Sequence, residues 1–339
     1  MSHKKLYVLF FACFALAATP LASFAQGQGR GAGRGQGSGR GRGGGSGRGG
    51  GSGRGSAAAA PISIKQVKPG VYMVINGGGN STVRVTDQGV IVVDTKNLGD
   101  QFYNDLMAQI KTVTSQPVKY AVVTHVHQDH AGNIERFEKA GVPVIAYEGL
   151  NKNLTTGGPN GKGYEAAQGK PAAANMTYTK NKKIKLGKAQ AIVAHFDSGH
   201  TSGDSVVYFP DVKVVSLGDE FTATTPNCDY PDGGSILGWA KSLAQVLKWD
   251  FDTAIPGHGN DPMTKADVVT FQKRIDEIGK TAIALVKSGT PKDQLRQQIQ
   301  MKMGADLGNW MMTGVVNDMR LDLFYDEISK AAKSGKSSD

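Results

Sequence analysis

The densest group of side chains that could bind a metal is the segment Thr124-His125-Val126-His127-Gln128-Asp129-His130. It follows the apolar run Lys119–Thr124, which predicts a buried strand, and it precedes a helical pattern. His125 and His127 are two residues apart, so their side chains point to the same side of an extended chain. The turn that follows can bring Asp129 and His130 to a neighbouring point. Imidazoles with a carboxylate are ligands that zinc prefers, so we predict a metal site at this strand end.

Three further segments repeat one design, in which an apolar strand ends and a His or Asp follows in a glycine-bearing turn. They are Gly199-His200-Thr201-Ser202-Gly203-Asp204, Leu217-Gly218-Asp219 and Ile255-Pro256-Gly257-His258-Gly259. Each is weak alone, because a single His in a Gly-rich loop is more often a surface residue than a ligand. Apart from His3, however, every histidine except His195 lies in one of these four segments. That concentration favours one shared metal site.

In this order, the four segments resemble the metallo-β-lactamase superfamily. The first motif is highly specific, and the later ones are specific because of their order. The resemblance covers roughly Ile62–Ala332, including the strand pattern Gly89–Asp94. It implies an α/β (α+β) fold, a four-layer αββα metallo-β-lactamase sandwich with metals at one edge between the sheets. The helical patterns after His258 predict extra C-terminal helices.

The resemblance also implies a role for each residue of the motifs. The first metal would be held by His125, His127 and His200, and the second by Asp129, His130 and His258, with Asp219 bridging the two. The implied cofactors are two zinc ions, with iron or manganese as alternatives. Asp129 would also act in catalysis, by orienting the nucleophile and passing a proton to the leaving group.

Two adjacent metals acidify a shared water and polarise the bond under attack, so the expected reaction is hydrolysis of a small-molecule ester, lactone, thioester or related bond. β-Lactamases of the first subclass have Cys where Asp219 stands, and those of the third usually lack a bridging Asp. The chain is thus closer to the general hydrolase and glyoxalase II-like branches. Three alternatives stay open: a class B3-like β-lactamase, a mono-iron persulfide dioxygenase, and a non-enzymatic envelope protein with structural metal.

Other residues near these motifs have ambiguous roles in the sequence. His195 is either a satisfied or surface histidine or, less expected, a ligand or a partner of one. Asp94 could support a metal ligand or simply cap a turn. Asp204 is expected to order the Gly199–Thr201 turn. We expect no ligand role for Cys228, which lies in a Pro-containing loop.

Strands and helices must position these residues. We predict buried strands over Gly89–Asp94, Lys119–Thr124 and Val142–Tyr147. The polar, Gly-rich Leu150–Lys170 predicts a long loop beside the site. Further expected strands are two within Val71–Val85, then Ile184–His195, Ser205–Phe209, Val212–Leu217 and Thr253–Ile255. Expected helices are Asp100–Thr112, Gly132–Lys139, Ser235–Leu247, Lys265–Lys287, Asp293–Met303 and Val316–Ala332.

The first 60 residues differ from the rest. Lys4 and Lys5, the apolar run Leu6–Ala18 and the small-x-small site Ser23-Phe24-Ala25 predict a signal peptide over residues 1–25, cleaved after Ala25. We therefore expect a periplasmic or secreted protein. Residues 26–60 are rich in Gly, Arg and Ser, and we expect a disordered tether. Residues 61–339 are the predicted catalytic domain.

The formal net charge of +10 arises mostly outside that domain. The signal peptide contributes Lys4 and Lys5, and the tether contributes six arginines with no acid, which leaves about +2 for the folded part. The catalytic domain is therefore not a polyanion binder by charge. We expect no specific nucleic-acid partner, because the tether lacks aromatic residues for stacking. Weak contact of the basic tether with anionic envelope polymers stays open.

Overall fold

A computed structural model describes residues 60–157, 172–304 and 320–334. The predicted signal peptide and all but the last residue of the predicted tether lie outside the described residues. No helix of the described ranges is both long and apolar enough to cross a membrane.

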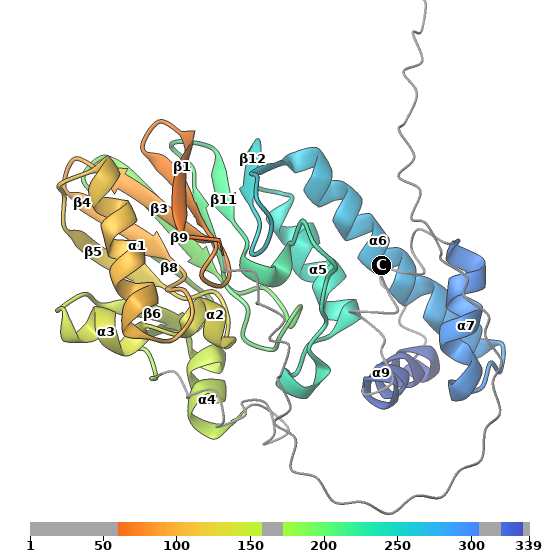
Figure 1. Cartoon of the computed structure of the whole chain (residues 1–339). Helices are drawn as coiled ribbons and strands as arrows, with labels where there is room; N and C mark the ends of the chain where they lie inside the picture. Colours follow the sequence, from red (N-terminus) through yellow and green to blue (C-terminus); the bar gives the residue numbers. More distant parts are fainter. Residues whose placement is uncertain (1–59, 158–171, 305–319, 335–339) are drawn as a thin grey trace, which may run out of the picture. The chain divides into compact units, whose positions relative to one another are not determined.

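The first of two sheets contains seven strands in chain order (Figure 1). They are β1 (Ser63–Lys68), β2 (Val71–Ile75), β3 (Ser81–Thr86), β4 (Gly89–Val93), β5 (Val118–Val122), β6 (Val144–Tyr147) and β7 (Met176–Tyr178). Neighbours are antiparallel from β1 to β4 and parallel from β4 to β7. The carboxyl ends of β4 and β5 therefore lie side by side.

The second sheet has six strands, in the order β13-β12-β11-β10-β9-β8. Their bounds are β8 (Asn181–Leu186), β9 (Ala189–Ala194), β10 (Val206–Phe209), β11 (Val214–Ser216), β12 (Thr253–Ile255) and β13 (Met263–Thr264). Only β11 and β12 pair in parallel, with Ser216 opposite Ile255. Segments that leave these two strands at their carboxyl ends therefore begin next to each other.

Both faces of β4 are buried, which explains its uninterrupted apolar sequence. Val90 and Val92 face helices on one side, whereas Ile91 and Val93 pack against residues of the second sheet such as Val207. Helices also cover the outer face of the second sheet, where Trp239 and Phe271 belong to one apolar cluster with strand residues. The layers are thus helices, sheet, sheet and helices, and the predicted αββα sandwich is confirmed.

Helices of the first half of the chain cover the first sheet, and later helices cover the second. The first set is α1 (Asp100–Val113), α2 (Gln128–Ala131), α3 (Ile134–Lys139) and α4 (Glu148–Thr156). The second set is α5 (Ile236–Val246) and α6 (Lys265–Lys287), with two short 3-10 helices, η2 (Gly218–Glu220) and η3 (Tyr230–Asp232), before them. The last described helices, α7 (Lys292–Met303) and α9 (Leu321–Ser334), pack against α6.

Two of the predicted elements were wrong. The first part of the predicted loop Leu150–Lys170 is helical in α4, because Leu150 and Leu154 share one face and are buried against the first sheet. The predicted single strand Ile184–His195 is a hairpin, β8 and β9, that reverses at Gly187, whose φ of 61° favours glycine. Strands β1, β7 and β13 were not predicted. Residues 158–171 of the predicted loop and residues 316–319 of the predicted helix Val316–Ala332 lie outside the described ranges.

Candidate metal centre

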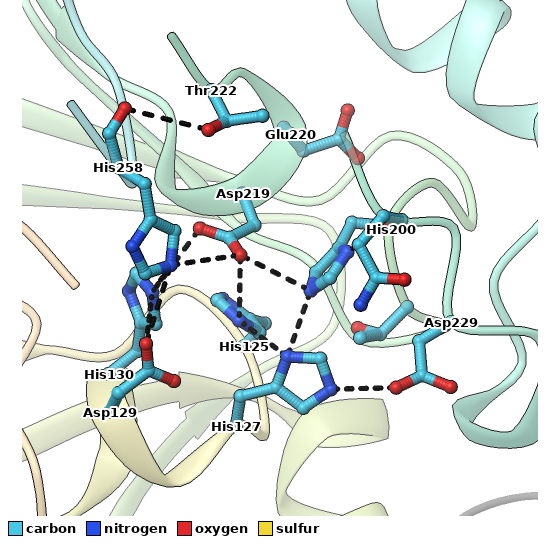
Figure 2. Close-up of polar contacts among 12 residues, drawn as sticks. His125, His127, Asp129, His130, His200, Asp219, Glu220, Thr222, Asp229 and His258 are labelled. Atoms are coloured by element: carbon cyan, nitrogen blue, oxygen red, sulfur yellow. Dashed lines mark hydrogen bonds and ion pairs between the residues drawn. The ribbon is translucent and has the colours of Figure 1, made fainter. Parts of the chain in front are cut away.

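The residues predicted as metal ligands come together where strands of both sheets end (Figure 2). Ser205 N donates to Thr124 O over 2.7 Å, which fixes the end of β5 beside the segment that follows His200. Because β11 and β12 are parallel neighbours, Asp219 and His258 leave the second sheet side by side. From the first sheet, after β5, come His125, His127, Asp129 and His130; from the second, after β9, β11 and β12, come His200, Asp219 and His258.

Three imidazole nitrogens converge in the first group of ligands. His127 Nδ1 lies 3.2 Å from His125 Nε2 and 2.9 Å from His200 Nε2. Ligand atoms placed about 2.0–2.1 Å from a tetrahedral zinc ion lie about 3.3 Å from one another. The spacing therefore suits one cation between the three rings.

The second group combines one carboxylate with two imidazoles. Asp129 Oδ2 lies 3.3 Å from His258 Nε2 and 3.6 Å from His130 Nε2. The two imidazole nitrogens are themselves 3.3 Å apart. This group is more open than the first, since the side chains of His258 and Asp129 are 35% and 30% exposed.

Asp219 lies between the two groups. Its Oδ2 is 3.6 Å from His200 Nε2 and 3.4 Å from His258 Nε2, and its Oδ1 is 3.2 Å from His130 Nε2. Burial raises the pKa of the Asp219 carboxyl, but the charge and hydrogen bonds of its histidine neighbours outweigh burial and hold this pKa well below its usual value. The side chain is therefore an ionised carboxylate in position to contact a cation in either group.

Acidic neighbours favour a positive charge on His127 of the first group and on His130 of the second, whereas burial lowers the pKa of His125 and of His200. Burial lowers the pKa of His127, but hydrogen bonds to Asp229 and Asp232 outweigh it and raise that pKa to about 10. Likewise, Asp129 and Asp219 outweigh burial and raise the pKa of His130 well above its usual value. Protons held this firmly are the competitors that a metal ion would displace. Donor types, spacing and charge thus all fit divalent cations.

Acceptors outside the cluster fix the orientation of four of the histidine rings. His127 Nε2 donates to Asp229 Oδ2 over 2.9 Å, and His130 Nδ1 donates to Asp94 Oδ2 over 2.8 Å. His125 Nδ1 donates to Thr124 Oγ1 over 3.0 Å, and His200 Nδ1 donates to the carbonyl of Asn227. Such bonds set the tautomer and leave the opposite nitrogen free for a metal.

Asp229 and Asp232, together with the Asn227 carbonyl, are the functional residues that sequence reasoning missed. Asp229 meets His127 across 102 positions of the chain. The only signal available was their place in an acid-containing, Gly- and Pro-bearing loop that follows Asp219.

The structure also clarifies the ambiguous residues. Asp94 contacts His130, as the support role predicts, and also accepts from Thr124 N. Asp204 accepts from Thr201 N and Oγ1, which agrees with its expected role in the His200 turn. His195 stacks on Tyr147 and donates to the carbonyl of Asp204, so it is a satisfied histidine outside the cluster. Cys228 is buried, with its thiol toward the carbonyl of Gly199.

Glycines allow the close packing around the ligands. A Cβ on Gly257 would lie 2.0 Å from Asp219 Oδ1, and one on Gly79 would lie 2.1 Å from the His130 ring. The turn that contains Gly79 is anchored by Lys96, whose buried ammonium donates to the carbonyls of Gly79 and Val74. Side chains at these two positions would push the ligands apart.

A cavity of about 360 Å³ opens on the second group. Its ligand side is formed by His127, Asp129, Asp219 and His258. Its other wall comes from the loop after Asp219, through Thr222, Thr224, Thr225 and Asn227. A small molecule in this cavity would meet the ligands on one side and uncharged hydrogen-bonding groups on the other.

Comparison with known families agrees with this fold and site. The profile of the metallo-beta-lactamase superfamily matches residues 74–258, more than half of the 339-residue chain. The chain therefore belongs to the metallo-beta-lactamase superfamily, whose members are metal-dependent hydrolases, and its His/Asp cluster is suited to divalent metal.

The individual relatives share 28% or less of the aligned residues with this chain. The chain is 28% identical over 196 residues to a metallo-beta-lactamase type 2 of Elizabethkingia meningoseptica, and this alignment covers 55% of this chain and 74% of that protein. A solved metallo-beta-lactamase from Pontibacter korlensis matches with a TM-score of 0.53 at 20% identity, over 63% of this chain and 98% of that one. A double mutant of the sec-alkyl sulfatase PisA1 matches with a TM-score of 0.61 at 18% identity, over 82% of this chain and 51% of that one. The two structural matches show the shared fold.

Proposed function

We propose that the chain is a hydrolase with a binuclear zinc centre that cleaves an ester, lactone, thioester or related bond in a small molecule. The observation that carries this proposal is the position of Asp219, whose carboxylate faces both groups of histidines. A structural zinc site is closed and four-coordinate, whereas this arrangement offers seven candidate ligands for two ions and an open side. An open site is what catalysis requires.

Bound zinc ions would supply an acidified water and polarise the bond to be cleaved. The chain's own residues would transfer the proton and orient the metal ligands. Asp129 lines the cavity, so its carboxylate can hold the attacking water and receive its proton before passing it to the leaving group. Asp94 and Asp229 hold His130 and His127 in their ligand tautomers.

The wall of the cavity supports an uncharged substrate. Thr222 and Thr224 share a hydrogen bond between their hydroxyls over 2.7 Å, and Thr225 and Asn227 extend this polar surface. No Lys or Arg is among the described residues that line the cavity. Recognition of an anionic substrate group would therefore rest on the metal ions, whereas an ester or lactone needs only hydrogen bonds.

A second candidate is hydrolysis of β-lactams, which is favoured by the similarity to the E. meningoseptica metallo-beta-lactamase. We place it second because Asp219 occupies the position of the cysteine of first-subclass β-lactamases.

A panel of chromogenic substrates tests these proposals. It should contain an ester, a lactone, a thioester, a β-lactam, a phosphodiester and an alkyl sulfate. We expect zinc-loaded protein to cleave an ester, lactone or thioester at least about 10-fold faster, in kcat/KM, than the β-lactam. A β-lactam cleaved fastest would instead establish the second candidate. Oxygen consumption with a persulfide that depends on iron would support the dioxygenase alternative.

We also propose that the protein is exported, on the basis of Lys4-Lys5, the apolar run Leu6–Ala18 and the site before Gln26. N-terminal sequencing of protein from the native host's periplasm or medium is expected to begin at or near Gln26. Mature protein that still carries Met1 would contradict export by this signal.

A further inference from the structure

Glu327 of helix α9 accepts four hydrogen bonds from the segment Tyr230–Leu237. Its Oε2 accepts from the Tyr230 hydroxyl over 2.7 Å and its Oε1 from the Ser235 hydroxyl. The backbone N–H groups of Ile236 and Leu237 also donate to this carboxylate, each over 3.3 Å. These two groups are among the first N–H groups of α5, which have no partner within the helix. One side chain from the end of the chain thus holds the loop and the start of α5 together.

The opposite side of the loop that contains Tyr230, residues 227–235, contacts two ligands of the first group. Asp229 Oδ2 accepts from His127, and the carbonyl of Asn227 accepts from His200. The backbone adds two bonds around the His200 turn, since Asp229 N donates to His200 O over 2.7 Å and Ser235 N donates to Gly199 O over 2.9 Å. A shift of this loop would therefore move both acceptors together with the turn that carries His200.

We propose that Glu327 is a positioning residue for the first metal site, acting through the loop 227–235. The proposal rests on the proposed metal centre. Glu327 lies beyond residues 74–258, the part of the chain that matches the superfamily profile, so the last described helix would add a support of its own to the shared ligand set. If the carboxylate is removed, its four donors must find water or remain unsatisfied, and the loop that orients His127 and His200 loses its anchor.

The test is the affinity of each metal site in purified full-length protein, measured by competition of zinc with a chromogenic chelator. Two stepwise constants are expected, and His125→Ala and His258→Ala, which each remove one ligand from a different group, assign them to the first and second sites. We expect Glu327→Ala to lower the zinc affinity of the first site by about 10-fold and to change that of the second by less than about 2-fold. A loss of about 10-fold is at the low end of what removal of a residue that supports a metal ligand causes. Glu327→Gln keeps one acceptor oxygen and should retain most of the affinity.

Asp326→Ala is the matched control, because Asp326 is the exposed neighbour of Glu327 on the same helix. It should leave both constants unchanged. If Glu327→Ala matches this control, or if it weakens both sites equally, the positioning role is wrong. If Glu327→Ala fails to fold, Tyr230→Phe replaces it, because this variant removes one of the four donors. It is expected to lower the zinc affinity of the first site selectively, by less than the roughly 10-fold expected for Glu327→Ala. Equal constants for Tyr230→Phe and wild type would overturn the proposal. Wild-type protein that binds no zinc would overturn the metal centre itself, and this outcome is distinct from all the others.

Discussion

Chelation of the metal is expected to abolish hydrolysis, and added zinc is expected to restore it. No Ser, Cys or Lys is among the described residues that line the cavity, so the proposed nucleophile is a water molecule activated by the metal. Binding to zinc lowers the pKa of water to about 7, so removal of the metal should lower turnover by more than about 1000-fold. The measurement is turnover of the best panel substrate before chelation, after dialysis with chelator, and after stepwise return of zinc.

A mock dialysis without chelator is the control for slow inactivation. Metal-free protein that keeps a tenth or more of its turnover, with the metal content verified in the same sample, would show that the reaction does not need the centre. Restoration by iron alone, coupled to oxygen consumption, would replace the hydrolase with the dioxygenase alternative.

Substitution Asp129→Asn is expected to lower turnover by about 100- to 10,000-fold while the first metal stays bound. Asn keeps the size of the side chain and one oxygen, but it cannot accept the proton of the attacking water. Asp129 belongs to the second group and is not among the residues that enclose the first, so His125, His127 and His200 remain in place. The measurements are kcat and zinc content of the same preparation.

Asp250→Asn is a suitable control, because the Asp250 side chain is 81% exposed and pairs with Lys213. It should change neither quantity. An Asp129→Asn variant with near wild-type kcat would mean that another group orients the water. Loss of both metals would mean that Asp129 is chiefly a structural ligand.

The sequence predicted best what is encoded locally. His125, His127, Asp129 and His130 are contiguous with a strand whose apolar run is unambiguous, so both their proximity and their place at a strand end could be predicted. The concentration of histidines indicated one shared site, but the arrangement of layers and the division of the ligands between two metals came from the family resemblance. Nothing in the sequence states that β11 and β12 lie side by side.

Contacts between distant segments could not be predicted in this way. Asp229 is recognisable as a partner of His127 only when the fold brings them together, and Glu327 meets Ser235 across 92 positions. The helix α4 was mistaken for loop because its polar and glycine residues outweigh its few apolar ones in sequence, whereas burial of Leu150 and Leu154 against the sheet decides its conformation.

The central claim is that the two groups joined by Asp219 bind a pair of zinc ions. The most direct test is elemental analysis of protein prepared with zinc and then dialysed against metal-free buffer. About two zinc ions per chain are expected for the wild type, and about one for His125→Ala. Less than about half a metal ion per chain in carefully prepared, folded wild-type protein would contradict the whole site assignment.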